Sequence, residues 1–423
     1  MATTRRQFLE LVGGAAALAT ARLDTAPAFA QATPVRMGVL TIKSGIGAQV
    51  GEAGLRSAQW TTDRINKAGG ILGRKLELVV EEESTPKDTV ERFRKLALQN
   101  KVDVITGVIS TGVSLAIGPV AEELKMLWIS WDGTTQKGVE ETMPNPRYSF
   151  RSTDNECEAV MASIVVAKNW KGKFRTVAGI NPDYSYGRDN WQAFLWIMEK
   201  YGNPVTPVSD LWPKLGTTDF TAHVAALQQA KPDLIFSSHW AGDASVLMKQ
   251  AHAAGLVGNT KFVFVVAGGV HETLKKSFTP EGMFLGYNTI YFDYADASPL
   301  QKQFVKEYND RYKEWPVFEC ERAYLVTSAY KAAVEKAAKA IGGKWPTTDQ
   351  VIDALEGLEL ESLGGKARYR KDHIPECNFY GGFTTYKNRF DFVTIDPVVK
   401  MTGPEVQKPS GVGLKDWIQS WKV

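Results

Sequence analysis

The sequence predicts an α/β protein of two doubly wound lobes, each a parallel sheet covered by helices. From residue 34 onward, short apolar stretches rich in β-branched residues alternate with amphipathic helical stretches, the pattern typical of parallel sheets. The alternation runs twice, with an irregular stretch around Pro144 and Pro146 between the two series. A chain of 423 residues also exceeds one ordinary core. Two lobes are therefore expected.

The first series of elements begins directly after Pro34. Gly69, Gly70 and Gly73 indicate a tight turn between its first helix and its second strand. We expect strands at residues 35–40, 75–83, 102–106 and 126–129, and helices at 51–68, 86–100 and 113–124.

The second series repeats the same alternation. We expect helices at residues 156–169, 190–201, 220–229 and 244–254, and strands at 176–180, 205–211, 234–237 and 262–266.

The C-terminal third breaks this rhythm. We expect long helices at residues 299–312 and 318–340, a shorter one at 351–358, and strand-like pieces at 367–369, 382–386 and 392–395. These helices have too few strands of their own to form a sheet. We therefore expect them to complete the two lobes already begun.

Residues 1–30 have the features of an export signal. Arg5 and Arg6 precede Phe8 and Leu9 and a short apolar run, which is the twin-arginine pattern of the Tat route. The segment 28–30, Ala-Phe-Ala, is a small-x-small cleavage site. The run is too short and too rich in Gly and Ala to span a membrane. We expect the mature chain to begin near Gln31 and to reside in the periplasm.

The composition excludes several classes of function. With 50 Lys and Arg against 47 Asp and Glu, the chain lacks the basic excess of a nucleic-acid partner. No stretch after the signal approaches 18 continuous apolar residues. The five histidines are scattered without metal-ligand spacing, so no metal site or cofactor is expected. Cys157, Cys320 and Cys377 permit one disulfide in an oxidising compartment, but the sequence does not select the pair.

Polar loops follow several of the predicted strands. In an open parallel sheet, ligands bind beyond the carboxyl ends of the strands. The loops at these ends are rich in small, hydroxyl-bearing and aromatic residues, and they span 41–49, 107–112, 130–135, 181–188 and 238–243. Any one of them could simply turn the chain and cap a helix, but several together favour a binding pocket.

Enzyme signatures are incomplete. Gly45 and Gly47 begin a dinucleotide-type fingerprint, but Gly51 comes one residue too late for the third glycine. Neither the nucleophile motif G-x-S-x-G nor a P-loop occurs. Asp132 and Asp183 suit helix caps or ligand acceptors better than an acid/base pair. We therefore expect a binding protein and no catalytic residues.

The segment 66–76, Asn-Lys-Ala-Gly-Gly-Ile-Leu-Gly-Arg-Lys-Leu, is the most specific marker in the chain, and 104–107 and Tyr186-Gly187 support it. With these motifs the chain resembles the type I periplasmic binding proteins of the leucine/isoleucine/valine-binding family over about residues 35–386. The resemblance implies a substrate-binding component of an ABC importer, which closes on a small solute and delivers it to an inner-membrane permease. The alternatives are a periplasmic sensor subunit and an exported enzyme that uses the same cleft.

The resemblance also implies three crossings between the lobes, which we expect near residues 151–153, 286–288 and 364–367. Lobe 1 would then comprise residues 31–152 and 287–365, and lobe 2 residues 153–286 and 366–423. We expect the protein to be a monomer.

Matching the motifs of the family residue by residue gives a set of expected ligand contacts. Hydroxyl and backbone groups of lobe 1 would hold a carboxylate, Tyr186 would close over the ligand, and the next aromatic position falls at His239 or Trp240. Trp131 and Tyr184 add further aromatic surface, and Lys43 is a candidate counter-charge. The expected ligand-binding residues are Ser110, Thr111, Trp131, Gly133, Thr134, Tyr184, Tyr186, His239, Trp240 and Phe318.

One departure from the family bears on the ligand. Members that bind α-amino acids carry an acidic residue after the strand that here ends near Val266, where it meets the ammonium group. In this chain residues 267–270 are Ala-Gly-Gly-Val, and no acid occurs before Glu272. An unpaired buried ammonium would be costly. The sequence therefore favours an aromatic carboxylate or an amide over a branched-chain amino acid.

Overall fold

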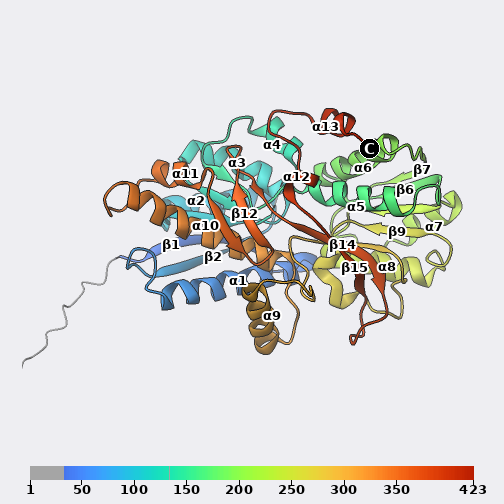
Figure 1. The fold of residues 1–423 in the computed structure, drawn as a ribbon, viewed down its shortest axis with the longest axis horizontal. Helices are drawn as coiled ribbons and strands as arrows, with labels where there is room; N and C mark the ends of the chain where they lie inside the picture. The colour runs from blue at the N-terminus through green and yellow to red at the C-terminus, as the bar shows by residue number, and fades with distance from the viewer. Residues whose placement is uncertain (1–32, 133) are drawn as a thin grey trace, which may run out of the picture. The chain divides into compact units, whose positions relative to one another are not determined.

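The computed structural model describes residues 33–132 and 134–423, and Pro34–Val423 form one compact unit. Two large sheets organise this unit, as Figure 1 shows. The predicted export signal and the predicted site residue Gly133 lie outside the described residues. Across the described ranges, no helix combines the length and the apolar character that a membrane crossing requires.

The first sheet is parallel throughout, with strand order β2-β1-β3-β4-β5. Its elements are β1 (Val35–Ile42), α1 (Ala48–Lys67), β2 (Leu76–Glu83), α2 (Pro86–Arg94), β3 (Val104–Gly107), α3 (Thr111–Leu124), β4 (Trp128–Ser130), α4 (Gln136–Thr142) and β5 (Ser149–Phe150). A 3-10 turn, η1 (Gly45–Gly47), precedes α1, and a π-helical turn, η2 (Lys95–Gln99), extends α2.

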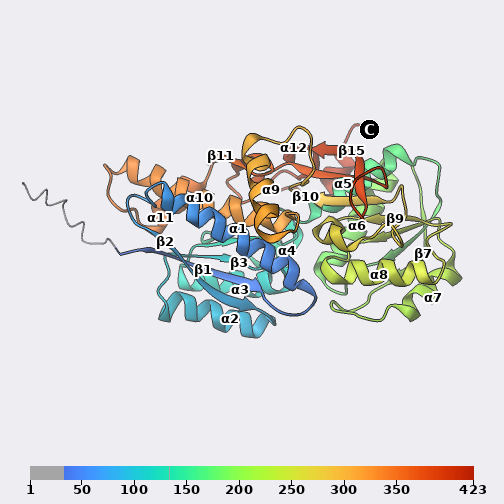
Figure 2. The ribbon, with the colours of Figure 1, turned by 90° about the horizontal axis from the view of Figure 1, so that it is seen from below.

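Alternation along the strands places apolar side chains on both faces of this sheet. Val35, Met37 and Val39 pack into the core that α1 and the later helix α10 (Phe318–Ala340) cover, whereas Leu40 packs with residues of α2 and α3 on the other face. Figure 2 shows α1, α10 and α11 (Thr348–Leu355) on one side of the strands and α2 and α3 on the other. The expected doubly wound arrangement is confirmed for this sheet.

The second sheet has strand order β15-β14-β10-β9-β8-β6-β7. Its elements are α5 (Glu156–Asn169), β6 (Thr176–Ile180), α6 (Ser185–Lys200), β7 (Thr206–Leu211), α7 (Thr221–Ala230), β8 (Leu234–Ser237), α8 (Ala241–Ala253), β9 (Lys261–Phe264), η3 (Ala267–Thr273), β10 (Phe284–Asn288), β14 (Phe379–Thr385) and β15 (Thr394–Met401). The five strands from β6 to β10 are parallel, whereas β14 runs antiparallel to both β10 and β15. The second sheet is therefore mixed, with β14 and β15 forming an antiparallel edge on a parallel sheet. The reason is the short connection from Thr385 to Thr394, which suits an antiparallel pair but leaves no room for a crossover.

The C-terminal third supplies covering helices and a small sheet. Its elements are α9 (Pro299–Tyr312), α10, α11 (Thr348–Leu355), β11 (Glu359–Ser362), β12 (Gly365–Tyr369), β13 (Pro375–Glu376), α12 (Gly403–Val406) and α13 (Leu414–Ser420). Ala323, Val326 and Tyr330 of α10 pack into the core of the first sheet. Phe304 of α9 packs edge-on against Trp60 of α1, with ring centroids 4.9 Å apart. The expectation that these helices complete structures begun earlier is confirmed.

The chain passes from one large sheet to the other more than once. It leaves the first sheet at Phe150, packs α10 back on that sheet after Asn288, and enters the second sheet again at Phe379. The lobe boundaries themselves stay a prediction. Cys157, Cys320 and Cys377 are buried free thiols, so none of the possible disulfide pairs is formed.

Candidate functional site

A small cavity lies where the carboxyl ends of strands from both large sheets meet. Residues after β3 and β4 of the first sheet and after β6, β8 and β9 of the second contribute to its wall, together with the first residues of α5 and α10. The lining residues are Ile109, Thr111, Asp132, Asn155, Glu158, Tyr184, Tyr186, Trp240, Val266 and Phe318. This is the location that the parallel-sheet rule predicts.

The loop after β3 is held in place by a glycine and a buried carboxyl group. Gly107 has a φ of +97°, and a Cβ there would lie 1.9 Å from the carbonyl oxygen of Leu40. Glu83 accepts hydrogen bonds from the backbone N–H groups of Ile109 at 2.7 Å and Ser110 at 2.8 Å. Burial raises the pKa of Glu83 to about 8, although these two bonds oppose the rise. These constraints fix Ile109 and Thr111 at the cavity.

Aromatic rings from the second sheet form another part of the wall. Tyr184 and Tyr186 flank the start of α6 with ring centroids 5.9 Å apart, and the indole N–H of Trp240 donates to the hydroxyl of Tyr184 at 3.0 Å. Gly187 allows this tight start, because a Cβ there would lie 2.1 Å from the carbonyl oxygen of Pro182. The sequence Tyr186-Gly187 thus serves the geometry of the turn as well as the wall.

A cluster of charged groups lies beside the cavity. The guanidinium of Arg322 is fully buried and makes ion pairs with Asp132, with Glu158 at 3.3 Å and with Glu319 at 3.4 Å. Glu158 also accepts hydrogen bonds from the hydroxyl of Tyr186 at 2.5 Å and from the amide of Asn288. We call Asp132, Glu158, Glu319 and Arg322 the acidic cluster.

Burial is the largest influence on the pKa values of Glu158 and Glu319 in this cluster. It raises the pKa of Glu158 to about 8, with Arg322 opposing the rise and Asp132 adding to it. Burial likewise raises the pKa of Glu319 well above its usual range. Three carboxyl groups share one guanidinium, and a charged group out of water is costly unless it is paired. The wall can therefore exchange protons close to neutral pH.

Five of the predicted site residues lie together at the cavity: Thr111, Tyr184, Tyr186, Trp240 and Phe318. The others lie elsewhere. Ser110 is next to the wall, but its N–H group is bound to Glu83.

The remaining three described candidates are buried away from the cavity. Trp131 packs in the core of the first sheet. The backbone oxygen of Thr134 accepts a hydrogen bond from Arg151 at 2.9 Å. His239 packs edge-on against Phe220, with Nδ1 3.7 Å from a carboxylate oxygen of Asp243. The candidate counter-charge Lys43 is exposed and is not among the lining residues.

Sequence reasoning missed Asn155, Glu158, Glu319 and Arg322. A signal was present, because two helices carry clustered charges in their first turns, at residues 156–158 and 319–322. Their partners are far away in the sequence: Glu158 and Arg322 are 164 positions apart. Glu272 accepts a hydrogen bond from the N–H of Trp315 at 2.6 Å and does not reach the cavity.

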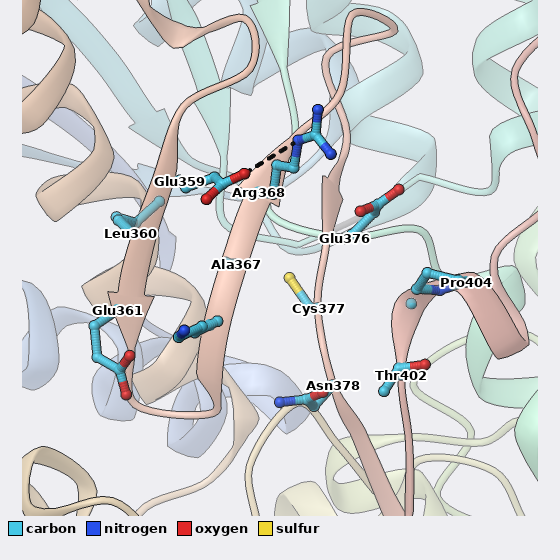
Figure 3. A pocket seen from close by; sticks show the side chains of 12 residues that line it. Glu359, Leu360, Glu361, Ala367, Arg368, Glu376, Cys377, Asn378, Thr402 and Pro404 are labelled. Atoms are coloured by element: carbon cyan, nitrogen blue, oxygen red, sulfur yellow. Dashed lines mark ion pairs between the residues drawn. The ribbon is translucent and has the colours of Figure 1, made fainter.

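A wider groove lies between β12, residues 376–378 and the start of α12 (Figure 3). It arises because β12 pairs with β13 over only two residue pairs before the chains diverge. Its charged side chains have mixed signs, and Glu359 pairs with Arg368 at 3.6 Å across β11 and β12. The groove is not at the ends of the parallel strands, so the smaller cavity is the better candidate.

Comparison with known proteins gives one consistent family. The family model described as periplasmic binding protein matches residues 34–382. The Leu/Ile/Val-binding protein BraC3 of Rhizobium johnstonii is 26% identical over 83% of this chain and 92% of its own length. The Leu/Ile/Val-binding protein homolog 3 of Brucella melitensis is 27% identical over 85% of this chain and 93% of its own length.

Solved structures show the same fold. A periplasmic binding protein of Burkholderia mallei superposes with a TM-score of 0.76 at 18% identity, covering 92% of this chain and 99% of its own. A solute-binding protein of an ABC transporter from Rhodopseudomonas palustris, in complex with 3,4-dihydroxybenzoic acid, superposes with a TM-score of 0.73 at 23% identity. The match covers 88% of this chain and 98% of its own. A branched-chain amino acid transporter substrate-binding protein of Streptococcus pneumoniae, in complex with isoleucine, superposes with a TM-score of 0.71 at 20% identity. The match covers 88% of this chain and 100% of its own.

Proposed function

The chain belongs to the periplasmic binding protein family and is an ABC transporter solute-binding protein, and we propose that it captures its solute in the cavity between the two large sheets. One observation carries this proposal. The wall is built from both sheets, because Thr111 and Asp132 follow strands of the first and Tyr184, Tyr186 and Trp240 follow strands of the second. A ligand there would touch both sheets at once.

Such a ligand favours the closed arrangement by its differential affinity. When the ends of the two sheets separate, half of the wall leaves the ligand, so the closed form binds more tightly and gains population. The closed form would then dock on an inner-membrane permease. The role is that of a transport component and requires no bond to be made or broken.

Export is part of this proposal. The twin arginines and the Ala-Phe-Ala site predict that residues 1–30 direct the chain to the periplasm and are removed. N-terminal sequencing of the protein from a periplasmic fraction should then begin near Gln31. Replacing Arg5 and Arg6 by Lys should leave the precursor in the cytoplasm, and periplasmic delivery of that variant would contradict the Tat assignment.

The relatives supply the first compounds to test. Their names and titles mention leucine, isoleucine, valine, 3,4-dihydroxybenzoic acid, 4-hydroxybenzoate and benzoate. A thermal-shift screen of residues 31–423 against these compounds and small amides should find at least one that raises Tm, because a ligand that binds only the folded form stabilises it. Absence of any shift, confirmed by calorimetry, would contradict the proposal.

Variants then locate the site. Trp240→Ala should weaken binding of the compound found by at least about tenfold, because a buried aromatic anchor is lost. Trp345→Ala is the matched control, since that side chain is 36% exposed and stacks on Arg74, away from the cavity. Equal losses in both variants would contradict binding in this cavity.

A further inference from the structure

The cavity wall has an excess of acidic groups. Among the ten described residues that line it, Asp132 and Glu158 carry carboxyl groups, and none is Lys, Arg or His. Both carboxyl groups are at least nine-tenths buried. A wall of this kind is poorly suited to an anion and well suited to a positive group that supplies hydrogen-bond donors.

The surroundings of Glu158 define what such a group would meet. Tyr186 of α6, Asn288 of β10 and Arg322 of α10 all donate hydrogen bonds to its carboxyl oxygens, and Asp132 lies on the other side of Arg322. Arg322 is shared among three carboxyl groups. The acidic cluster thus has a formal charge of −2 when every group is ionised, which a buried site cannot sustain without protons or another cation.

The rest of the wall suits a cation as well. Tyr184, Tyr186, Trp240 and Phe318 present aromatic rings to the cavity, and the faces of such rings attract positive charge. The ring of Phe318 already contacts one positive charge, because the guanidinium of Arg322 lies 4.6 Å from its centroid.

We infer that the solute carries a cationic nitrogen, which lies between the aromatic rings and pairs with Asp132 and Glu158. This inference rests on the proposed function of the cavity. The acid that the sequence lacks after Val266 is then replaced by two carboxyl groups from other elements, the loop after β4 and the first turn of α5.

Binding of such a solute displaces a proton. Because the pKa of Glu158 is raised to about 8, this carboxyl group is mostly protonated at pH 7 when the cavity is empty. A cation stabilises the ionised form, so the proton leaves to the buffer as the cation enters. The charge of the cavity is unchanged by this exchange.

Three probes of matched shape test the inference: benzylamine, benzamide and benzoate, which carry +1, 0 and −1 charge at pH 7 on the same ring. Calorimetry on residues 31–423 should show benzylamine binding at least about tenfold more tightly than benzoate. Titrations in two buffers of different ionisation enthalpy should show release of up to about one proton per benzylamine. Its affinity should rise from pH 6 to pH 8.

Two variants separate this site from other acids. Glu158→Gln should abolish the proton release and weaken benzylamine about tenfold, whereas Glu272→Gln, a carboxyl group after β9 that does not line the cavity, should change neither. If Glu158→Gln does not fold, the proton release of the unmodified protein and the variant Asp132→Asn serve in its place.

The outcomes distinguish this inference from the function on which it rests. Preferred binding of benzoate, or binding of benzylamine without proton release, overturns the inference. If the probes fail but the wider screen finds an anionic or neutral solute, the inference is overturned and the proposed function stands. A zwitterionic or cationic solute from that screen is judged by the same proton release and the same variants. If no solute binds at all, the proposed function fails first.

Discussion

Arg322 holds together three buried carboxyl groups. Its guanidinium pairs with Asp132, Glu158 and Glu319 and is fully buried. Replacing it by Met preserves much of its length but leaves these carboxyl groups without a counter-charge. We expect Arg322→Met to lower the free energy of unfolding by about 3–5 kcal/mol at pH 7, measured by urea denaturation.

The matched control is Arg56→Met. Arg56 pairs with Glu52 and Glu314, but its side chain is 20% exposed and Glu314 is 44% exposed. A loss of about 0–1 kcal/mol is expected there. If the free energy of unfolding fell by similar amounts in Arg322→Met and Arg56→Met, burial of the cluster would not be the cause of the destabilisation.

Buried carboxyl groups also make the stability of the unliganded protein depend on pH. Burial raises the pKa of Glu83 and Glu158 to about 8 and that of Glu321 to about 7, from 4.5. Over that interval the folded state binds more protons than the unfolded state, so stability falls as pH rises. His271 has the opposite effect on stability, since burial lowers its pKa to about 4. Its stabilising effect grows as pH rises from 4 to its usual pKa of 6.5 and no longer changes at higher pH.

We therefore expect Tm to fall between pH 6.5 and pH 8.5, as measured by calorimetry. Glu83→Gln should flatten this fall, because it removes one of the groups that must ionise. Glu281→Gln should leave the slope unchanged, since the pKa of that exposed carboxyl group lies below its usual value. A Tm that is constant or rises over this range would contradict the raised pKa values.

At the scale of single elements, the turn between β3 and α3 is the most constrained part of the site. Gly107→Ala would place a Cβ 1.9 Å from the oxygen of Leu40 at a φ of +97°, so we expect a loss of about 3 kcal/mol or more. Gly112→Ala, in the first turn of α3, meets nothing within 4 Å and should be neutral or stabilise by up to about 1 kcal/mol. Denaturant midpoints of the two variants give the comparison, and equal midpoints would contradict it.

The elements that the sequence predicts well are those whose apolar pattern is local. The strand expected at 35–40 is β1, and the helix expected at 318–340 is α10 with the same bounds. β10 and the two-residue strands β5 and β13 were missed, because they are defined by their partners in the sheet. The antiparallel direction of β14 is likewise a tertiary property that its residues do not encode locally.

At the scale of the whole molecule, the distinction between local pattern and tertiary packing explains which site residues the sequence predicts. Tyr184, Tyr186 and Trp240 could be predicted because they follow strands whose carboxyl ends meet at one edge. Glu158 and Arg322 could not, since they lie on helices α5 and α10 and their pairing depends on how those helices pack. Trp131 and His239 follow strands too, yet they turn into the cores. Position in the loop predicts the neighbourhood of a side chain but not its direction.

A hydrogen bond between α6 and the residue that precedes α4 offers a test of closure. Asp189 of α6 accepts a hydrogen bond from the hydroxyl of Thr135 at 2.7 Å and lies 3.5 Å from the ammonium of Lys137. Thr135 follows β4 of the first sheet, whereas α6 follows β6 of the second. Separation of the sheets' ends would break this contact, so it stabilises the closed form alone.

Asp189→Ala should therefore weaken binding of the solute about tenfold although Asp189 is not part of the cavity wall. The loss should lie mainly in a faster dissociation rate, measured by stopped-flow fluorescence, because the closed complex opens more often. Asp183→Ala is the control, since that exposed carboxylate pairs with Arg188 at 2.5 Å within its own loop and helix. Unchanged dissociation in Asp189→Ala would mean that this contact persists when the solute leaves, and closure would then have to pivot elsewhere.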